Sequence, residues 1–87
     1  MSYFVYILIS KKDHKLYIGC TKDFDQRFLE HNSKKVPSTK YRAPFDVLLV
    51  ETFNEKGEAF NRERFLKSLW SSRFKKKLKL EYLQSRA

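Results

Sequence analysis

The sequence contains few of the residues that crosslink or interrupt a chain: its 87 residues include one cysteine, two glycines and two prolines. The single cysteine, Cys20, excludes an intrachain disulfide and is typical of a reducing compartment. So few glycines and prolines predict little irregular structure. No apolar run approaches the roughly 18 residues that a membrane span needs, and no basic signal-peptide segment precedes the first strand-like run. We therefore expect a cytoplasmic protein without a membrane partner.

Acidic residues are also scarce. Ten Asp and Glu stand against 19 Lys and Arg, which gives a formal net charge of +9 and a pI near 9.8. This charge favours a nucleic-acid partner over the alternatives of solubility alone or a membrane surface. The candidates for contacts with a nucleic-acid backbone are Lys34, Lys35, Lys40, Arg42, Lys67, Arg73, Lys75, Lys76 and Lys77. Tyr41 is a candidate for stacking on an exposed base, with packing inside its loop as an equal alternative.

Aromatic residues are abundant, with eight Phe, five Tyr and one Trp to build a core. Residues 3–9 are apolar on both faces, which predicts a central strand. Residues 11–14 read as a polar turn and residues 15–20 as the returning strand of a hairpin. If that turn holds an even number of residues, Tyr6 and Tyr17 lie on the same face of the sheet, and a slip of one residue would separate them.

The rest of the chain predicts one further strand and three helices. A helix begins near Thr21–Asp23 and runs to about Lys34, with Phe24 and Phe28 on its buried stripe. A basic loop over 33–44 leads to a strand at 45–53, and helices follow at about 55–70 and 73–85. We expect one domain over 1–87 of the α/β (α+β) class. It has a small three-stranded, mostly antiparallel sheet flanked by helices, in the order β-β-α-β-α-α, and the chain crosses over the first strand on its way to the third.

Glu63 interrupts the apolar stripe of the second expected helix. Ala59, Leu66 and Trp70 recur at helical spacing, and Glu63 falls within about 40° of Ala59 around the axis. A carboxylate in such a stripe needs a cation, a hydrogen-bond network or a metal ion. A salt bridge to a nearby Lys or Arg and a metal-ligating role both explain it.

Arg27 and His31 lie four residues apart on the first expected helix and are therefore neighbours. His31 lies within about 20° of Phe24 around the axis, so it borders the buried face. Alone, such a histidine is more often a half-buried structural residue. Most strand tyrosines likewise serve packing, and a phenol with a pKa near 10 needs a neighbouring cation, base or metal-bound water to act in catalysis.

Together these residues resemble the GIY-YIG nuclease superfamily. Phe4-Val5-Tyr6 stands where Gly-Ile-Tyr stands in the name, and Tyr17-Ile18-Gly19 matches its second half. Arg27, His31 and Glu63 match the helical positions of the motif. The likeness extends from Tyr3 to about Leu83 and is greatest to small stand-alone bacterial members, which are similar to the N-terminal nuclease domain of the excision-repair C subunit.

The resemblance implies a metal-dependent endonuclease that hydrolyses phosphodiester bonds in DNA. Glu63 would hold one divalent ion, Mg²⁺ or Mn²⁺. Arg27 would clamp the scissile phosphate. Tyr6 would orient or deprotonate the attacking water with His31 as its proton relay, and Tyr17 would contact a phosphate oxygen or position that water.

The chain departs from the superfamily in two places. Cys20 stands where some members carry a lysine that assists the tyrosine, which shifts the relay onto His31. The third expected helix offers no counterpart to the polar residue, commonly Asn, of larger members. With no attached DNA-binding domain, we expect structure-selective cutting, as in DNA repair, and a protein partner that supplies specificity. The rivals are a catalytically weak or inactive binding module of the same fold, and a basic structural or ribosome-associated protein.

Overall fold

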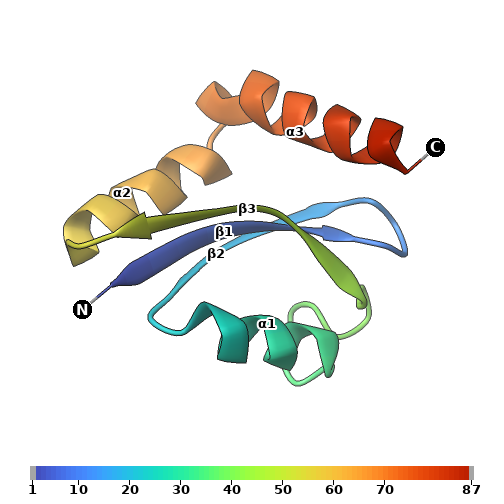
Figure 1. The fold of residues 1–87 in the computed structure, drawn as a ribbon, viewed down its shortest axis with the longest axis horizontal. Coiled ribbons are helices and arrows are strands. Elements are labelled where there is room, and N and C mark those ends of the chain that lie inside the picture. Colours follow the sequence, from blue (N-terminus) through green and yellow to red (C-terminus); the bar gives the residue numbers. More distant parts are fainter. Residues whose placement is uncertain (1, 87) are drawn as a thin grey trace.

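The computed structural model describes residues 2–86, which form a three-stranded sheet with helices on both of its faces (Figure 1). The expected α+β class and the order β-β-α-β-α-α are confirmed. In chain order the elements are β1 (Tyr3–Ser10), β2 (Leu16–Thr21), α1 (Phe24–Asn32), β3 (Phe45–Phe53), α2 (Lys56–Lys67), the 3₁₀-helix η1 (Leu69–Ser71) and α3 (Ser72–Ser85).

The sheet has the strand order β2-β1-β3, and both pairings are antiparallel. β1 is therefore the central strand, as its two apolar faces predict, and the chain crosses it between β2 and β3. A hydrogen bond from Ser10 N to Lys15 O (3.0 Å) closes a turn with an even number of residues. Tyr6 lies opposite Gly19, two residues from Tyr17 on β2. Tyr6 and Tyr17 therefore share a face of the sheet, since side chains alternate along a strand.

One face of the sheet is covered by α1, which lies below the sheet in Figure 1. Here Phe24 and Phe28 of α1 pack against a buried cluster that includes Tyr6 and Leu8 of β1. We call this side the α1 face. Phe24 and Phe28 thus occupy the buried stripe expected from their helical spacing.

The other face is covered by α2 and α3, which lie above the sheet in Figure 1. Ala59 and Leu66 of α2 form a fully buried cluster with Val5 and Ile7 of β1, and Leu78 of α3 packs against it. We call this side the α2 face. Because β1 is apolar on both sides, it supplies the core of both layers.

Two helices are shorter than expected. α1 begins at Phe24 because the side chain of Asp23 caps it, accepting from Gln26 N at 3.1 Å. α2 ends at Lys67 because the backbone of Ser68 is extended (φ −90°, ψ 166°). The expectation that Trp70 continues the buried stripe is therefore wrong: Trp70 lies in η1 and is 89% exposed. Within residues 2–86, no helix is long and apolar enough to cross a membrane.

The loop between α1 and β3 is anchored at both ends by one side chain. Asn32, the last residue of α1, accepts a hydrogen bond from Phe45 N at 2.7 Å and donates to Phe45 O at 3.3 Å. Inside the loop, Val36 and Thr39 are buried although the segment has no regular structure. The loop is therefore packed against the α1 face.

Candidate active site

The side chain of Tyr6 crosses the outer strand of the sheet at Gly19. The two residues are partners in the β1–β2 ladder, and β2 is an edge strand. A Cβ atom on residue 19 would overlap the Tyr6 hydroxyl and lie 2.5 Å from its Cζ atom. Glycine is required because it lets the ring approach the backbone this closely. The pair places the phenol hydroxyl over the outer strand.

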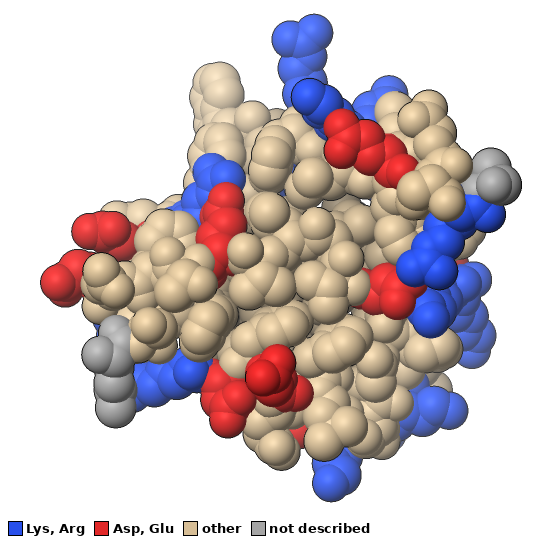
Figure 2. Space-filling model, in the orientation of Figure 1, with Lys and Arg blue, Asp and Glu red and all other residues tan. Residues whose placement is uncertain are grey.

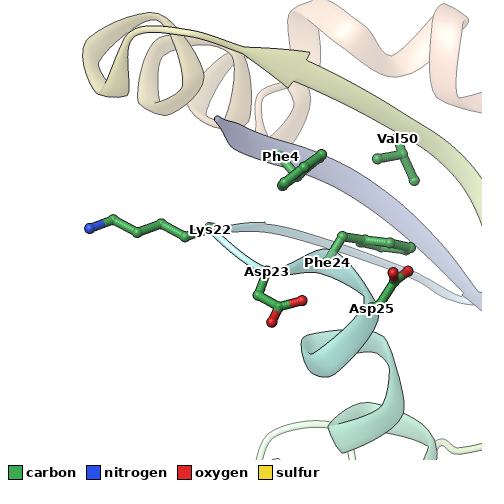
Figure 3. Close-up of a pocket in the computed structure, with 6 residues that line it drawn as sticks. All are labelled: Phe4, Lys22, Asp23, Phe24, Asp25 and Val50. Carbon is green, nitrogen blue, oxygen red and sulfur yellow. The ribbon is translucent and has the colours of Figure 1, made fainter. Parts of the chain in front are cut away.

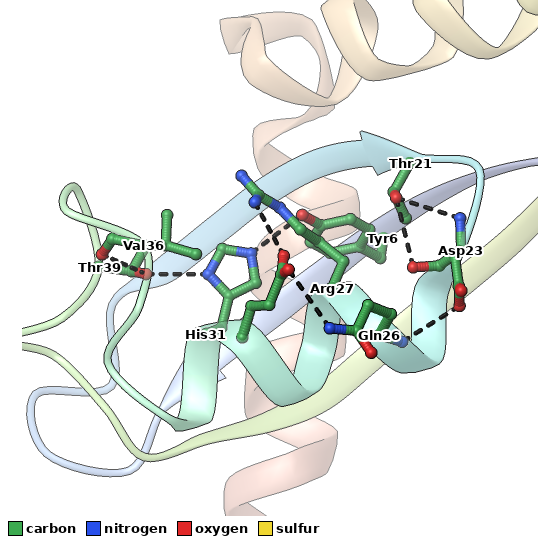
Figure 4. A network of polar contacts seen from close by, with 9 residues as sticks. Tyr6, Thr21, Asp23, Gln26, Arg27, His31, Val36 and Thr39 are labelled. Atoms are coloured by element: carbon green, nitrogen blue, oxygen red, sulfur yellow. Dashed lines mark hydrogen bonds and ion pairs between the residues drawn. The ribbon is translucent and has the colours of Figure 1, made fainter.

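A chain of hydrogen bonds leads from this hydroxyl into the interior (Figure 4). The Tyr6 hydroxyl lies 3.0 Å from Nε2 of His31, and Nδ1 of His31 lies 2.9 Å from Oγ1 of Thr39. The Thr39 hydroxyl donates to the carbonyl of Val36 at 3.5 Å. His31 and Thr39 are fully buried and Tyr6 is 1% exposed. The chain joins β1, α1 and the loop that follows α1.

Aromatic rings enclose this chain. The ring centre of His31 lies 4.9 Å from that of Tyr17 and 6.0 Å from that of Phe45. The ring of Tyr6 meets Phe24 edge-on at 5.4 Å. Tyr17, half-buried, thus lies beside His31 on the same face as Tyr6, as the hairpin register predicts. These contacts fix the orientation of the imidazole and keep water from its sides.

Burial sets the protonation of both polar rings. It raises the pKa of Tyr6 to about 12, although Arg27 acts against this rise. Burial also lowers the pKa of His31, and the positive charge of Arg27 lowers it further. At neutral pH Tyr6 therefore keeps its proton, while His31 is a neutral imidazole that accepts a hydrogen bond through one ring nitrogen.

Arg27 lies one helical turn before His31, at the exposed border of the α1 face. Its Nη1 atom donates to Oε1 of Glu30 at 3.2 Å, and its side chain is 39% exposed. Figure 4 shows Arg27 beside Tyr6 and His31. An incoming phosphate would therefore have to displace the carboxylate of Glu30 from the Arg27 guanidinium.

Glu63 lies on α2, on the opposite face of the sheet from Arg27. Its side chain is 21% exposed and pairs with Nζ of Lys67 at 3.1 Å. Its negative charge adds to burial in raising the pKa of Cys20 on β2, and it also contributes to the raised pKa of Tyr6. The structure thus has the salt bridge considered from the sequence, between Glu63 and Lys67.

The donor set at Glu63 fits a hard divalent ion. Within residues 2–86, no group of three His, Cys, Asp or Glu side chains converges to enclose a metal. A structural zinc site needs four such ligands, whereas Mg²⁺ binds through one or two carboxylates and keeps several waters beside substrate phosphate oxygens. The present partner of Glu63 is the 56%-exposed side chain of Lys67, whose ammonium a cation would replace. A divalent ion at this place would therefore have Glu63 as its carboxylate ligand and would rely on water and substrate oxygens for the rest of its shell.

Part of the predicted nucleic-acid surface forms a hollow beside the α1 face. It is lined by Lys12, Lys34, Lys40, Tyr41 and Ala43. Nζ of Lys12 donates to the carbonyl of Tyr41 at 3.3 Å, and Nζ of Lys40 lies 4.9 Å from the centre of the Tyr41 ring. That ring is 76% exposed. The structure adds Lys12, from the hairpin turn, to the lysines expected from the loop.

Arg42, another predicted contact, is directed toward the hairpin. Its Nη2 atom donates to the carbonyl of Leu16 at 3.3 Å, and its Nε atom lies 3.5 Å from Oδ2 of Asp13. These contacts give Arg42 a structural role in joining the loop to the turn. Lys35 lies in the same loop and is exposed.

The remaining predicted contacts lie on the α2 face. Arg73, Lys76 and Lys77 line a hollow on α3, and Nζ of Lys75 donates to the carbonyl of Ser68 at 3.4 Å. In Figure 2 basic side chains gather mainly toward the right edge, where the hairpin and the C-terminal end of α3 lie in Figure 1. The predicted contacts therefore lie on both sides of the sheet, around the loop after α1 and on α3.

A separate hollow lies at the N-terminal end of α1 (Figure 3). It is lined by Phe4, Lys22, Asp23, Phe24, Asp25 and Val50. One of its two carboxylates, that of Asp23, is engaged as the α1 cap. None of the site residues predicted from the sequence lines this hollow.

Two residues that matter to the geometry were not predicted from the sequence as site residues. Gly19 carried a signal, because glycine inside a strand often marks a close approach of another group. Thr39 carried none, since nothing in a basic, proline-containing loop distinguishes a buried threonine from an exposed one. The tertiary packing alone brings it to His31.

The fold and the site together define a small α+β domain of the nuclease type. A family model described as the GIY-YIG catalytic domain matches residues 2–83, and the chain belongs to this family. A domain of this family supports a nuclease-type function and implies binding of nucleic acid.

Similar proteins of like size carry the name UPF0213. One from Staphylococcus saprophyticus is 43% identical over 77 residues, covering 86% of this chain and 90% of its own length. UPF0213 protein YazA of Bacillus subtilis is 36% identical over 81 residues, covering 92% and 79%. The solution structure of UPF0213 protein BH0048 from Bacillus halodurans has 40% identity and a TM-score of 0.56, covering 90% of this chain and 82% of that one. These names state no activity.

Proposed function

We propose that the protein is a metal-dependent endonuclease that hydrolyses phosphodiester bonds in DNA and selects its substrate by structure rather than by sequence. The observation that carries this proposal is the buried hydrogen bond between Tyr6 and His31, whose hydroxyl end lies over the outer strand. Arg27 borders this place from one face of the sheet, and the charge of Glu63 reaches it from the other. A proton path, a cation and a carboxylate are the groups that phosphodiester hydrolysis needs.

The protonation states support one direction of proton transfer. A phenol with a pKa raised to about 12 is a poor base alone, but it donates its hydrogen bond to a neutral imidazole. As water attacks phosphorus, one water O–H bond breaks and its proton passes to the Tyr6 oxygen. The bond from phosphorus to the leaving oxygen breaks, and the leaving oxygen takes up a proton from solvent. The phenol proton moves to Nε2 of His31 in the same step, so His31 ends as imidazolium. Tyr6 therefore carries the proton from the water at the outer strand to His31, the base, which stays buried.

The charged residues act on the phosphate. Arg27 would release Glu30 and donate to a non-bridging oxygen, and Tyr17 would hydrogen-bond a phosphate oxygen or position the water. A divalent ion at Glu63, when bound, supplies charge neutralisation at the phosphoryl and leaving oxygens. Lys67 would then turn from Glu63 to the DNA backbone.

Substrate selection by shape is supported by the hollow beside the α1 face. Its exposed Tyr41 ring offers a stacking surface for an unpaired base, and lysines on its walls attract the backbone without reading sequence. Flaps, nicks and single-stranded ends, the substrates of DNA repair, expose such bases. The free thiol of Cys20 suits the reducing cytoplasm.

The test is cleavage of labelled single-stranded, duplex, nicked, flap and branched DNA, and of RNA, each with Mg²⁺, Mn²⁺ or EDTA. Glu63→Gln is expected to abolish metal-dependent cutting while the thermal unfolding midpoint stays close to wild type. The matched control is Glu58→Gln on the exposed side of the same helix, which should cut normally. Equal activity of Glu63→Gln and wild type would refute the metal role.

Tyr6→Phe tests the proton path by removing one hydroxyl. We expect a loss of about 10²- to 10⁴-fold in cleavage rate, the usual contribution of a positioned proton-transfer group. We also expect a stability loss of about 1–3 kcal/mol, because a buried imidazole nitrogen loses its partner. Tyr3→Phe on the same strand is the control. A large stability loss with an unchanged rate would instead make Tyr6 a packing residue.

A second candidate is a binding module of the same fold with little or no turnover. It is favoured by one observation: both charged site residues already have internal partners, Arg27 with Glu30 and Glu63 with Lys67. Binding across the panel without cutting, with or without metal, would support it. Cutting that appears only when a second protein is added would indicate a nuclease that needs a partner.

A further inference from the structure

We propose that Thr39 is a positioning residue that holds His31 in the tautomer protonated at Nδ1, so that Nε2 is free to receive the Tyr6 proton. This inference rests on the proposed function. It concerns a residue of the loop after α1 that reaches no reacting atom and acts through His31.

Counting the protons in the hydrogen bonds that join Tyr6, His31 and Thr39 gives this assignment. A neutral imidazole has one N–H donor and one acceptor nitrogen, and a hydroxyl has one proton. The Thr39 hydroxyl donates to the carbonyl of Val36, so it accepts from Nδ1–H of His31. Nε2 is then the acceptor, and the Tyr6 hydroxyl donates to it. With this assignment, each proton in these three hydrogen bonds has an acceptor.

The reverse assignment leaves a proton without an acceptor. If Thr39 donated to Nδ1, Nε2–H would donate to the Tyr6 oxygen, and the phenol proton would need another partner. Among the hydrogen bonds of residues 2–86, His31 is the partner of that hydroxyl. Arg27, which also acts on the Tyr6 oxygen, has only donors. The reverse assignment also gives up the hydrogen bond from the Thr39 hydroxyl to the carbonyl of Val36, which disfavours this arrangement.

The backbone of the loop holds Thr39 rigidly in place. Thr39 N donates to the carbonyl of Val36 at 3.0 Å, and the carbonyl of Thr39 accepts from Arg42 N at 2.9 Å. Arg42 is itself bonded to the hairpin through its side chain. Both ends of the short turn are thus fixed, and the fully buried hydroxyl points at the imidazole.

The partner of His31 at Nδ1 is neutral, so it orders the ring without adding charge beside it. A carboxylate there would fix the same tautomer but would raise the pKa of His31 through its negative charge. The groups that contact the imidazole are neutral: Tyr6, Tyr17, Phe45 and Thr39. The charged neighbours, Arg27 and Glu30, lie on the same helix as His31 and act in opposite directions. Thr39 therefore orders the ring without protonating it at neutral pH.

The tautomer is measured directly by long-range ¹H–¹⁵N NMR of the full chain labelled with ¹⁵N-histidine, without substrate or metal. We expect wild type to show Nδ1 protonated and Nε2 bare. Thr39→Val, which keeps the shape and removes the acceptor, should shift the ring toward the Nε2–H form. Thr39→Ser should keep the wild-type tautomer. Thr52→Val, at an exposed threonine of β3, is the matched control.

Cleavage by the same variants tests the consequence. We expect Thr39→Val to lose about 10- to 100-fold in rate, as is typical when the positioning partner of a functional histidine is removed. Its Km should change little, and Thr39→Ser should recover most of the rate. An Nε2–H tautomer in wild type, or wild-type rates in Thr39→Val with the tautomer shifted, would overturn the proposal. The wild-type spectrum and Thr39→Ser decide the tautomer if Thr39→Val does not fold.

Failure of the proposed function would be recognised separately. If wild type cuts no substrate but its His31 is Nδ1–H and shifts in Thr39→Val, the assignment of the tautomer is supported and the nuclease proposal falls.

Discussion

The two faces of the sheet handle their polar groups in opposite ways. On the α1 face, His31 and Thr39 are fully buried, and their neutral hydrogen bonds end at the Tyr6 hydroxyl. On the α2 face, Glu63 is partly exposed and its partner Lys67 is largely in solvent. A proton path needs fixed geometry and exclusion of water, whereas a site for an ion and its waters must stay open. In the proposed enzyme, these two environments would act on one phosphate from opposite faces of the outer strand β2.

We expect the largest loss of activity from a substitution at Gly19, where the Tyr6 ring crosses β2. The other glycine of the chain, Gly57 on α2, provides the control. Gly19→Ala places a methyl group inside the Tyr6 ring, so we expect a loss of about 1–3 kcal/mol in stability and of at least about 10²-fold in cleavage. Gly57→Ala has open space around its Cβ and should leave cleavage unchanged while stabilising α2 by up to about 1 kcal/mol. Urea unfolding and a cleavage assay measure both. A fully active Gly19→Ala would show that the Tyr6 ring need not cross β2.

The second prediction concerns the pH dependence of stability and cleavage, which we expect to come from His31 on the α1 face. The pKa of His31 is lowered by burial and by Arg27, so the unfolded chain binds more protons near the ordinary pKa of about 6.5. Stability should therefore fall as pH decreases from about 6.5 toward the lower pKa of the folded state, and cleavage should fall as His31 becomes protonated. Denaturant unfolding of wild type, His31→Gln and His14→Gln across pH 5–8 measures this. His14→Gln, at an exposed position of the hairpin turn, is the control for replacing a histidine by glutamine. A slope unchanged in His31→Gln would contradict the buried neutral imidazole.

The smallest expected effect is on the salt dependence of DNA affinity, and it tests which face of the sheet binds DNA. If the hollow beside the α1 face binds the backbone, Lys34→Gln with Lys40→Gln should flatten the plot of log affinity against log salt by about 1.4 for single strands. Lys76→Gln with Lys77→Gln on α3 is matched in charge and should change this slope less. Fluorescence anisotropy at several salt concentrations measures both. The opposite ranking would assign DNA to the α2 face.

The sequence predicted the fold better than it predicted the details of the site. The apolar faces of residues 3–9 determined a central strand, and an even turn put Tyr6 and Tyr17 on one face. These are local properties, so periodicity reveals them. The end of α2 was misplaced because Trp70 continues the 3.6-residue pattern beyond Ser68, where the backbone becomes extended.

The contacts of the site depend on segments far apart in the chain, which periodicity does not describe. His31 was placed at the border of the buried face, but its bond to Tyr6 spans 25 residues and exists only after α1 packs on the sheet. Likewise, Glu63 was expected to need a cation, and Lys67, one turn away, provides it. The burial of Thr39 follows from the path of its loop and from no local pattern.

The attachment of α3 has a consequence for local unfolding. None of residues 72–85 is fully buried, Leu78 packs against the core, and Tyr82 and Arg86 bind Asp46 of β3 across 36 and 40 residues of sequence. A helix with so little buried surface opens at a smaller free energy than β1, so its amides should exchange with solvent first. The hydrogen bonds from Tyr6 to Thr39 do not involve α3. We therefore expect the C-terminal helix to open and close as a unit while the hydrogen bonds between Tyr6, His31 and Thr39 stay intact.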